Sequence, residues 1–161
     1  MKNLEETVNS TVTSKSRPRV LIGDKWSGEP GSLSQKGFLL RNGHLKLWYD
    51  FAQTEQEFLD KARAGKYDVL LVEPIWSDAD YRGGTMKGYE LLEKVYDLAP
   101  VRLLLTDSGL DDYADPYAYG ATGWIEKTAS AQRLWNAIEQ GMKVHEYRMQ
   151  REKRDRHPTR E

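Results

Sequence analysis

The segment Tyr67–Glu73, with the sequence YDVLLVE, decides the fold. Its centre, Val69–Val72, is entirely aliphatic, which is typical of a strand buried on both faces of a parallel sheet. The residue at the end of this strand is an acid, Glu73. We therefore predict a central strand that places a carboxylate at the edge of the sheet.

Three further short aliphatic runs end in a polar residue in the same way. Arg19–Asp24 ends in an acid, Val101–Thr106 in a hydroxyl and Gly123–Lys127 in a lysine. In an open α/β sheet, functional side chains collect beyond the carboxyl ends of the strands. We therefore predict that the four terminal side chains form one site, which consists of Asp24, Glu73, Thr106 and Lys127.

Helical segments alternate with these strands. A capping box of Thr54 and Glu57 opens one helix, and Gly65 ends it. Alternating apolar and polar residues indicate a further strand at Leu45–Tyr49, with one more exposed face. Because strands and helices alternate along the chain, we predict an α/β fold, a doubly wound five-stranded parallel sheet with an extended C-terminal helix.

The composition is that of an ordinary folded domain. With 161 residues, 39% of them hydrophobic, the chain is long enough for one domain with a proper core. We predict a loose leader at residues 1–16, the domain at 17–140 and a charged helical extension at 141–161. The net charge of −1 gives no general attraction to nucleic acid or to an anionic membrane.

Several classes of site are excluded. The chain has no cysteine, which excludes disulfides and thiolate chemistry and suits the cytoplasm, where we expect the protein to be. With only His44, His145 and His157 available, we predict no metal cluster. The apolar runs are too short to cross a membrane. Neither a Ser/His/Asp arrangement nor a pair of carboxylates indicates an enzyme.

Two glycine-containing motifs accompany the strand ends. Gly88–Leu92 (GYELL) leads a predicted helix, and Gly120–Lys127 (GATGWIEK) contains the last predicted strand. Together with the strand ends, they resemble the receiver domain of bacterial response regulators, the CheY-like fold, over residues 17–140. The second motif is most similar to receivers attached to NarL-type helix-turn-helix regulators. The resemblance implies a flavodoxin-like fold and a role in two-component signal transduction.

The resemblance also implies roles for single residues. In that family two adjacent acids hold Mg²⁺, an aspartate accepts the phosphoryl group, a hydroxyl and a lysine contact the phosphate, and an aromatic side chain switches inward. The matching positions are Asp24 and Lys25 for the acids, Glu73 for the phosphoacceptor, Thr106 and Lys127 for the phosphate contacts, and Trp124 for the switch. The chain thus resembles a pseudo-receiver that lacks the phosphoacceptor aspartate.

These departures from the family oppose phosphoryl transfer. Mg²⁺ prefers a compact octahedral shell of oxygens, so replacing one acid by Lys25 weakens its site. Glu73 is one methylene longer than aspartate, so its carboxylate is displaced from the position for in-line attack. We therefore expect no cofactor, and Mg²⁺ with Asp24 as a weak ligand belongs only to an alternative in which the site still accepts phosphate.

Glu73 and the segment after it allow several interpretations. Lys25 and Lys127 can flank Glu73 as a metal-free cluster that fixes one conformation, or Glu73 simply forms a partly buried ion pair with one of them. Trp76 either covers the site or packs over a helix end. The loop at 77–85 contains Asp78 and Asp80, which are either solvated or replace the missing acid. Whether Glu73 mimics the active or the inactive state stays open.

One predicted partner surface is aromatic. It lies on the face that receivers use to meet partners and consists of Tyr113, Tyr117, Tyr119 and Trp124. Tyrosine is favoured at interfaces because it brings a large area at a low entropy cost. The alternative is that these tyrosines pack a weak fourth helix, interrupted by Pro116, onto the core.

The last helix offers a second surface. Its apolar stripe recurs at steps of three and four through Leu134, Ile138, Met142, His145 and Met149. Two copies could pair as a homodimer through the part that holds Met142 and Met149; alternatively, the extension is a solvated, fraying tail held by charge pairs. Acids interrupt its basic residues, so we do not expect nucleic acid as a partner.

Three functions follow in order of preference. The first is a stand-alone atypical receiver, a phosphorylation-independent module that binds a signalling protein such as a kinase, regulator or effector. The second is a phosphorylatable response regulator with a weakened Mg²⁺ site. The third is a flavodoxin-like binder of a small ligand, with Trp26 and Trp76 as walls, although the chain has no Gly-rich phosphate loop after the first strand.

Overall fold

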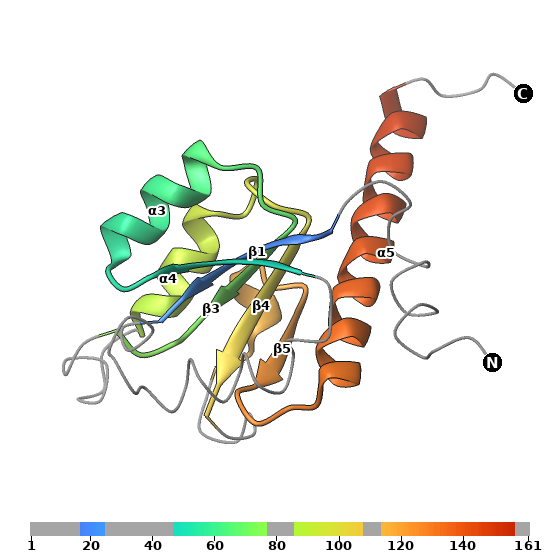
Figure 1. Ribbon diagram of the computed structural model, residues 1–161. Coiled ribbons are helices and arrows are strands. Elements are labelled where there is room, and N and C mark those ends of the chain that lie inside the picture. The colour runs from blue at the N-terminus through green and yellow to red at the C-terminus, as the bar shows by residue number, and fades with distance from the viewer. Residues whose placement is uncertain (1–16, 25–46, 77–85, 108–113, 157–161) are drawn as a thin grey trace, which may run out of the picture.

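The computed structural model shows a sheet whose strands are all parallel. The structure describes residues 17–24, 47–76, 86–107 and 114–156. The strands are β1 (Arg19–Gly23), β2 (Trp48–Ala52), β3 (Val69–Val72), β4 (Val101–Thr106) and β5 (Gly123–Glu126). Their order in the sheet is β2-β1-β3-β4-β5 (Figure 1). The strand order reverses between β1 and β3, where an open α/β sheet places its site.

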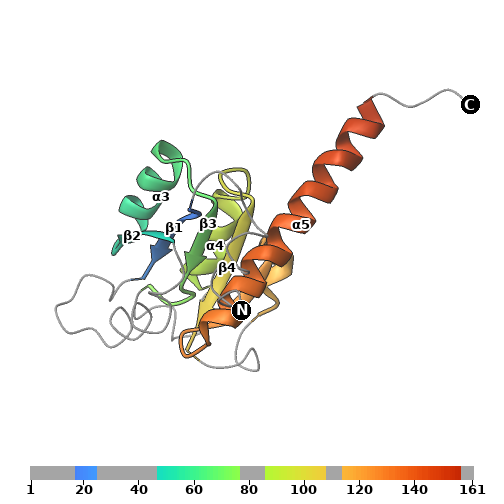
Figure 2. The same ribbon diagram turned by 45° about the vertical axis from the view of Figure 1, so that its right-hand side comes forward.

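Helices cover both faces of this sheet, which confirms the predicted doubly wound α/β fold. The helices are α3 (Glu55–Ala64), α4 (Lys87–Lys94) and α5 (Ala131–Arg156), with a short 3-10 helix, η3 (Pro116–Tyr119). Figures 1 and 2 show α3 and α4 on one side of the sheet and α5 on the other. Ser34 followed by Phe38, Leu39 and Leu40 is a pattern that predicts a short capped helix, and these residues lie outside the described ones.

Alternate residues of the buried strands supply the two halves of the core. Leu70 points into the layer under α3 and α4, where Phe58 and Tyr89 are fully buried. Its neighbour Leu71 points into the layer under α5, where Trp135 is fully buried. Each such side chain stabilises the fold by about 1.5–3 kcal/mol relative to exposure. A strand that is apolar at every position therefore has to lie between two layers of helices.

The boundaries of α3 follow the predicted caps, whereas β2 begins later than predicted. The Thr54 hydroxyl accepts a hydrogen bond from the backbone N–H of Glu57 at 3.1 Å, and Gly65 donates to the Lys61 carbonyl at 2.8 Å. The predicted strand at Leu45–Tyr49 is displaced, because β2 starts at Trp48. The N–H of Trp48 donates to the carbonyl of Pro18 at 2.9 Å, and this contact sets the register with β1.

The predicted C-terminal extension is the second half of α5, which continues without a break past Gln140. Gly141 is the last buried residue, and a Cβ added there would lie 2.9 Å from the methyl groups of Val101. From Lys143 onward every described residue is exposed, and the helix projects beyond the sheet (Figure 2). Within the described ranges, no helix has both the length and the apolar character to cross a membrane.

Candidate functional site

The candidate site lies at the carboxyl ends of four neighbouring strands. Past the strand ends, three backbone N–H groups donate hydrogen bonds of 2.8–3.0 Å to carbonyls of the neighbouring strands. They run from Asp24 to Ala52, from Glu73 to Gly23 and from Lys127 to Thr106. These bonds continue the sheet beyond its last regular residues and fix where each side chain starts. The predicted neighbourhood of the strand ends is therefore present in the structure.

Lys127 is the centre of an ion cluster. Its Nζ lies 2.9 Å from Glu73 Oε1, 3.7 Å from Asp24 Oδ2 and 3.1 Å from Asp107 Oδ1. Asp24 and Glu73 are buried, whereas the Asp107 side chain is 60% exposed. Because water screens an exposed carboxylate, Asp107 contributes less than the two buried ones. We call Asp24, Glu73 and Lys127 the buried ion cluster.

The buried ion cluster contains more acid than base. Burial and the adjoining carboxyl of Asp24 raise the pKa of Glu73, Lys127 lowers it by less, and the result is a pKa of about 9. Burial lowers the pKa of Lys127, but Glu73 and Asp24 outweigh this and raise it. Among the described residues, Glu73 Oε2 has no hydrogen-bond partner although it is buried. Burial and the nearby carboxyl of Asp24 both favour the protonated form of Glu73.

We expect Glu73→Gln to remove a pH dependence of stability. The folded protein keeps a proton on Glu73 that the unfolded chain releases above about pH 4.5, so the free energy of unfolding falls as the pH rises toward about 9. The slope reaches at most about 1.4 kcal/mol per pH unit. Urea denaturation at pH values from about 5 to 9 measures this slope.

Asp107→Asn is the matched control. Because Asp107 is exposed, this variant should keep the slope of the wild type. Equal slopes in wild type and Glu73→Gln would contradict the assignment.

Thr106 and Trp124 stand in β4 and β5, two of the strands that lead to the buried ion cluster, and are not part of it. Thr106 is fully buried, and its hydroxyl donates to the carbonyl of Ile125 at 3.5 Å. Trp124 is half-buried against the core under α4, and the guanidinium of Arg133 lies 5.4 Å from its ring centroid. The predicted site residue Lys25 lies outside the described residues. Of the predicted set, the structure therefore joins Asp24, Glu73 and Lys127.

Trp76 belongs to the core of the domain, in agreement with its packing interpretation. Its indole N–H donates to the carbonyl of Glu73 at 2.5 Å, and its ring centroid lies 6.1 Å from that of Phe58. The side chain thus ties the strand end that carries Glu73 to α3. Asp78 and Asp80, together with Trp26 of the predicted ligand crevice, fall outside the described residues.

The ammonium of Lys127 lies where the two buried carboxylates approach one another. Within the described ranges, no group of three or more His, Asp or Glu side chains is arranged to hold a metal ion. The weak Mg²⁺ role of Asp24 stays a prediction. In this arrangement Lys127 supplies the positive charge that faces Asp24 and Glu73.

The predicted aromatic surface is only partly exposed. Tyr119 packs on Tyr89 with 4.8 Å between ring centroids, whereas Tyr117 is 57% exposed. The fourth helix is the 3-10 turn η3, which Asp115 caps by accepting from the N–H of Tyr117 at 3.0 Å. Tyr113 and the other residues at 108–113 lie outside the described residues. Among the described residues of this set, Tyr117 is the most exposed, and Tyr119 and Trp124 are half-buried.

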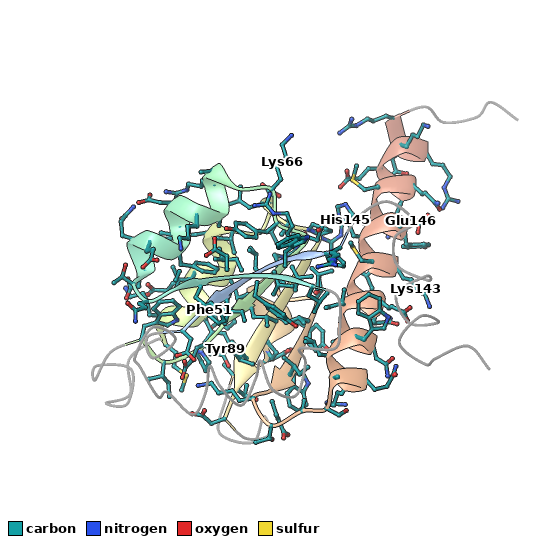
Figure 3. All side chains as sticks on the ribbon, viewed as in Figure 1. Phe51, Lys66, Tyr89, Lys143, His145 and Glu146 are labelled. Atoms are coloured by element: carbon teal, nitrogen blue, oxygen red, sulfur yellow. The ribbon has the colours of Figure 1, made fainter. Side chains whose placement is uncertain are left out.

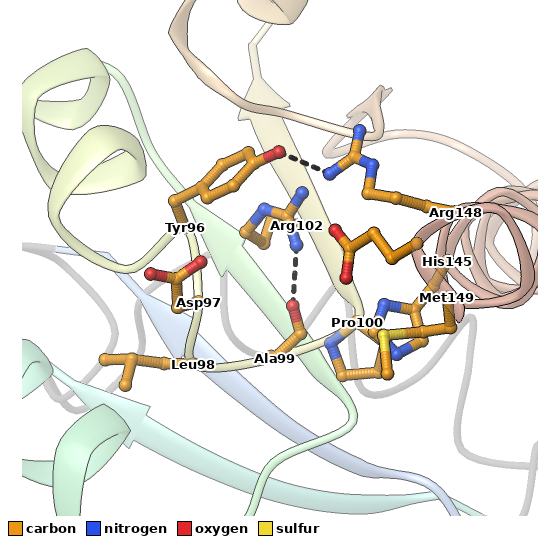
Figure 4. Close-up of a pocket in the computed structure, with 10 residues that line it drawn as sticks. Tyr96, Asp97, Leu98, Ala99, Pro100, Arg102, His145, Arg148 and Met149 are labelled. Carbon is orange, nitrogen blue, oxygen red and sulfur yellow. Dashed lines mark hydrogen bonds between the residues drawn. The ribbon is translucent and has the colours of Figure 1, made fainter. Parts of the chain in front are cut away.

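The predicted dimer stripe of α5 faces the domain itself. Met142 packs against the core under α5. His145 and Met149 line a groove of about 300 Å³ between α5 and the segment Tyr96–Arg102 (Figure 4). Met149 remains 54% exposed, so a homodimer through Met142 and Met149 stays a prediction, and it would have to share Met149 with this groove.

Two interacting residues were missed by sequence reasoning. Asp107 follows Thr106 directly and was overlooked as a loop residue. Arg102 is buried within β4, and its guanidinium donates to the carbonyls of Ala99 at 2.6 Å and Gly120 at 2.8 Å. It also lies 4.7 Å from the ring centroid of Tyr96. A charged residue inside an otherwise aliphatic strand was the available signal for Arg102.

Comparison with known proteins supports the fold. No protein-family model matches the sequence, and no curated protein is significantly similar to it. The receiver domain protein (CheY-like) of Methanospirillum hungatei JF-1 is 21% identical, with a TM-score of 0.60 over 83% of this chain and 99% of that one. The signal receiver domain of a putative LuxO repressor protein from Vibrio parahaemolyticus is 18% identical, with a TM-score of 0.62 over 83% and 95%.

A third structure agrees with these two. The chemotaxis protein CheY4 of Vibrio cholerae is 20% identical, with a TM-score of 0.57 over 77% of this chain and 98% of that one. At these identities the likeness concerns the arrangement of the chain. The protein has the fold of a CheY-like response-regulator receiver domain.

Proposed function

We propose that this protein is an atypical receiver, a signalling module that binds other proteins without control by phosphorylation. The observation that carries the proposal is the contact of 2.9 Å between Lys127 Nζ and Glu73 Oε1 at the phosphoacceptor position. In a receiver that works by phosphorylation, this lysine contacts the incoming phosphate. Here the ammonium of Lys127 already contacts a buried carboxyl group of the chain itself, that of Glu73.

The protonation of Glu73 supports the same conclusion. Attack on a phosphodonor requires an ionised carboxylate as the nucleophile. Burial and Asp24 raise the pKa of Glu73 to about 9, so its carboxyl is mostly protonated at neutral pH. Its extra methylene also displaces the reacting oxygen, and correct position is most of what an enzyme or receiver contributes to phosphoryl transfer.

Intact mass spectrometry after incubation with Mg²⁺ and a small-molecule phosphodonor tests this function. We expect no phosphoryl adduct on the native chain. An adduct on Glu73→Asp alone would show that the site is competent for phosphorylation and is silenced at one residue. If neither protein formed an adduct, the loss of phosphorylation would be assigned to the metal site as well. An adduct on the native chain that Glu73→Gln abolishes would overturn the proposal and establish a phosphorylatable response regulator.

A protein-binding role needs an accessible surface, and the residues near η3 provide one. Tyr117 is 57% exposed, and Trp124 is half-buried close to the start of α5. Tyrosine and tryptophan are enriched among the residues that dominate binding energy at protein interfaces. We assign this aromatic surface to partner contact and the buried ion cluster to holding one conformation.

A further inference from the structure

The second half of α5 has one side that the domain holds. The hydroxyl of Tyr96 accepts a hydrogen bond from Arg148, and the guanidinium of Arg148 lies 5.5 Å from the centroid of the same ring. Arg102 approaches that ring from the body of the domain, at 4.7 Å (Figure 4). Arg148 and Glu152 also line the groove beside this segment. The projecting helix is therefore fixed along this side.

The opposite side of the same helix is basic. Every step of three or four residues along a helix returns to the same face. The residues on this face, which we call the basic face, are Lys143, Tyr147, Arg151 and Arg154, with Val144 beside them. All of them are exposed, Tyr147 to 61% and Val144 to 37%. Figure 3 shows Lys143 on the side of α5 away from the sheet.

None of the acids of the extension lies at the centre of this face. Glu152 lines the groove on the side of the domain, and the helical steps place Glu146 and Asp155 on the flanks. Glu152 therefore lies away from Lys143, Arg151 and Arg154, and the other two acids lie at the edges of the basic face. Residues 143–156 contain six of the 24 basic and three of the 25 acidic residues, which gives the extension a charge of +3 and the rest of the chain −4.

We propose that the basic face binds an acidic amphipathic helix of a partner protein. Lys143 and Arg154 are about 16 Å apart along the helix axis, which is about three turns. A partner helix packed at 8–10 Å could cover Val144 and Tyr147 with apolar side chains and place its own Asp or Glu residues near Lys143, Arg151 and Arg154. This surface deepens the proposed role in protein binding and does not depend on whether Glu73 can be phosphorylated.

The charges argue against two other occupants. A second copy that docked through the same face would bring like charges together, because a two-fold contact pairs a surface with itself. A long nucleic acid would run from the extension toward the remainder of the chain, which carries a charge of −4. The exposed side chains of Val144 and Tyr147 also offer an apolar area that protein side chains can bury and phosphates cannot.

Fluorescence anisotropy with a labelled synthetic peptide tests the proposal. The probe is an acidic amphipathic peptide of about 20 residues, the length of a helix of about 30 Å. The decisive variant of the full chain is Arg151→Glu/Arg154→Glu. Its matched control is Lys153→Glu/Arg156→Glu, which makes the same change in net charge in the same turns but away from the basic face. Circular dichroism of both variants should show an intact helix.

The expected result is that the basic-face variant loses about tenfold or more in affinity, whereas the control loses less than about threefold. Binding should weaken with added salt, and Tyr147→Ala should weaken it further. No binding at about 0.05 M salt, where screening is weak, would overturn the proposal. Equal losses in the two variants would also overturn it. Tighter binding of a duplex DNA of similar length would assign the face to nucleic acid instead. None of these outcomes changes the mass measurement on Glu73.

Discussion

Replacing Lys127 by alanine is expected to lower the free energy of unfolding by about 3–5 kcal/mol at neutral pH. Lys127 faces the buried carboxyls of Asp24 and Glu73 at 3.7 and 2.9 Å. Removal of its ammonium takes away the positive charge that faces the two buried carboxyls, which costs more than the ion pair contributes on its own. Urea denaturation of wild type and variant measures the loss.

The loss should become smaller at acid pH, because uptake of a second proton neutralises both of the carboxyls that face Lys127. Lys127→Met separates charge from packing, since it keeps most of the side-chain volume and should be nearly as unstable as Lys127→Ala. Lys87→Ala is a surface control: Lys87 lies 2.9 Å from Glu90, and its side chain is 35% exposed. Its loss should stay below about 1 kcal/mol. A Lys127→Ala protein as stable as the Lys87→Ala protein would show that the cluster does not need its cation.

The central strands could be predicted from the sequence because burial on both faces favours an apolar residue at every position. Val69–Val72 is apolar throughout, and it lies between β1 and β4 with helices on both faces. The edge strand β2 was less predictable. Its residues are mostly half-exposed, so alternation fits several registers, and pairing with β1 selects the one that starts at Trp48. Contacts between distant segments, and not local pattern, fix such an edge.

The same distinction applies to the candidate site. Topology alone brings Asp24, Glu73 and Lys127 together, because parallel strands end at one edge of the sheet. The charge state of Glu73 could not be predicted, since it depends on its burial and on the distance to Asp24. The groove beside Arg102 was equally hidden, because Tyr96 and Arg148 are 52 residues apart in the sequence and meet only in the folded chain.

Gly88→Ala is expected to disturb the site from outside it, with a loss of about 3 kcal/mol, the upper end of ordinary overpacking. A Cβ at Gly88 would lie 2.1 Å from the carbonyl oxygen of Glu73 and 2.5 Å from the Cα of Pro74. Both neighbours are backbone atoms that cannot rotate away. The N–H of Gly88 also donates to the carbonyl of Pro74 at 3.0 Å, so α4 and the strand end cannot separate without losing this bond.

Alanine is a better helix former than glycine by about 1 kcal/mol, which is too little to offset this clash. Because Trp76 donates to the same Glu73 carbonyl, a displaced strand end should change the fluorescence of Trp76 as well as the stability. Gly123→Ala is the control, since among the described residues its Cβ would meet the end of the Leu103 side chain alone, at 3.2 Å, and we expect a loss below about 1.5 kcal/mol. If both variants were equally stable, α4 would be able to shift away from the Glu73 strand end with little loss of stability. Its glycine would then not be what holds the Glu73 strand end in place.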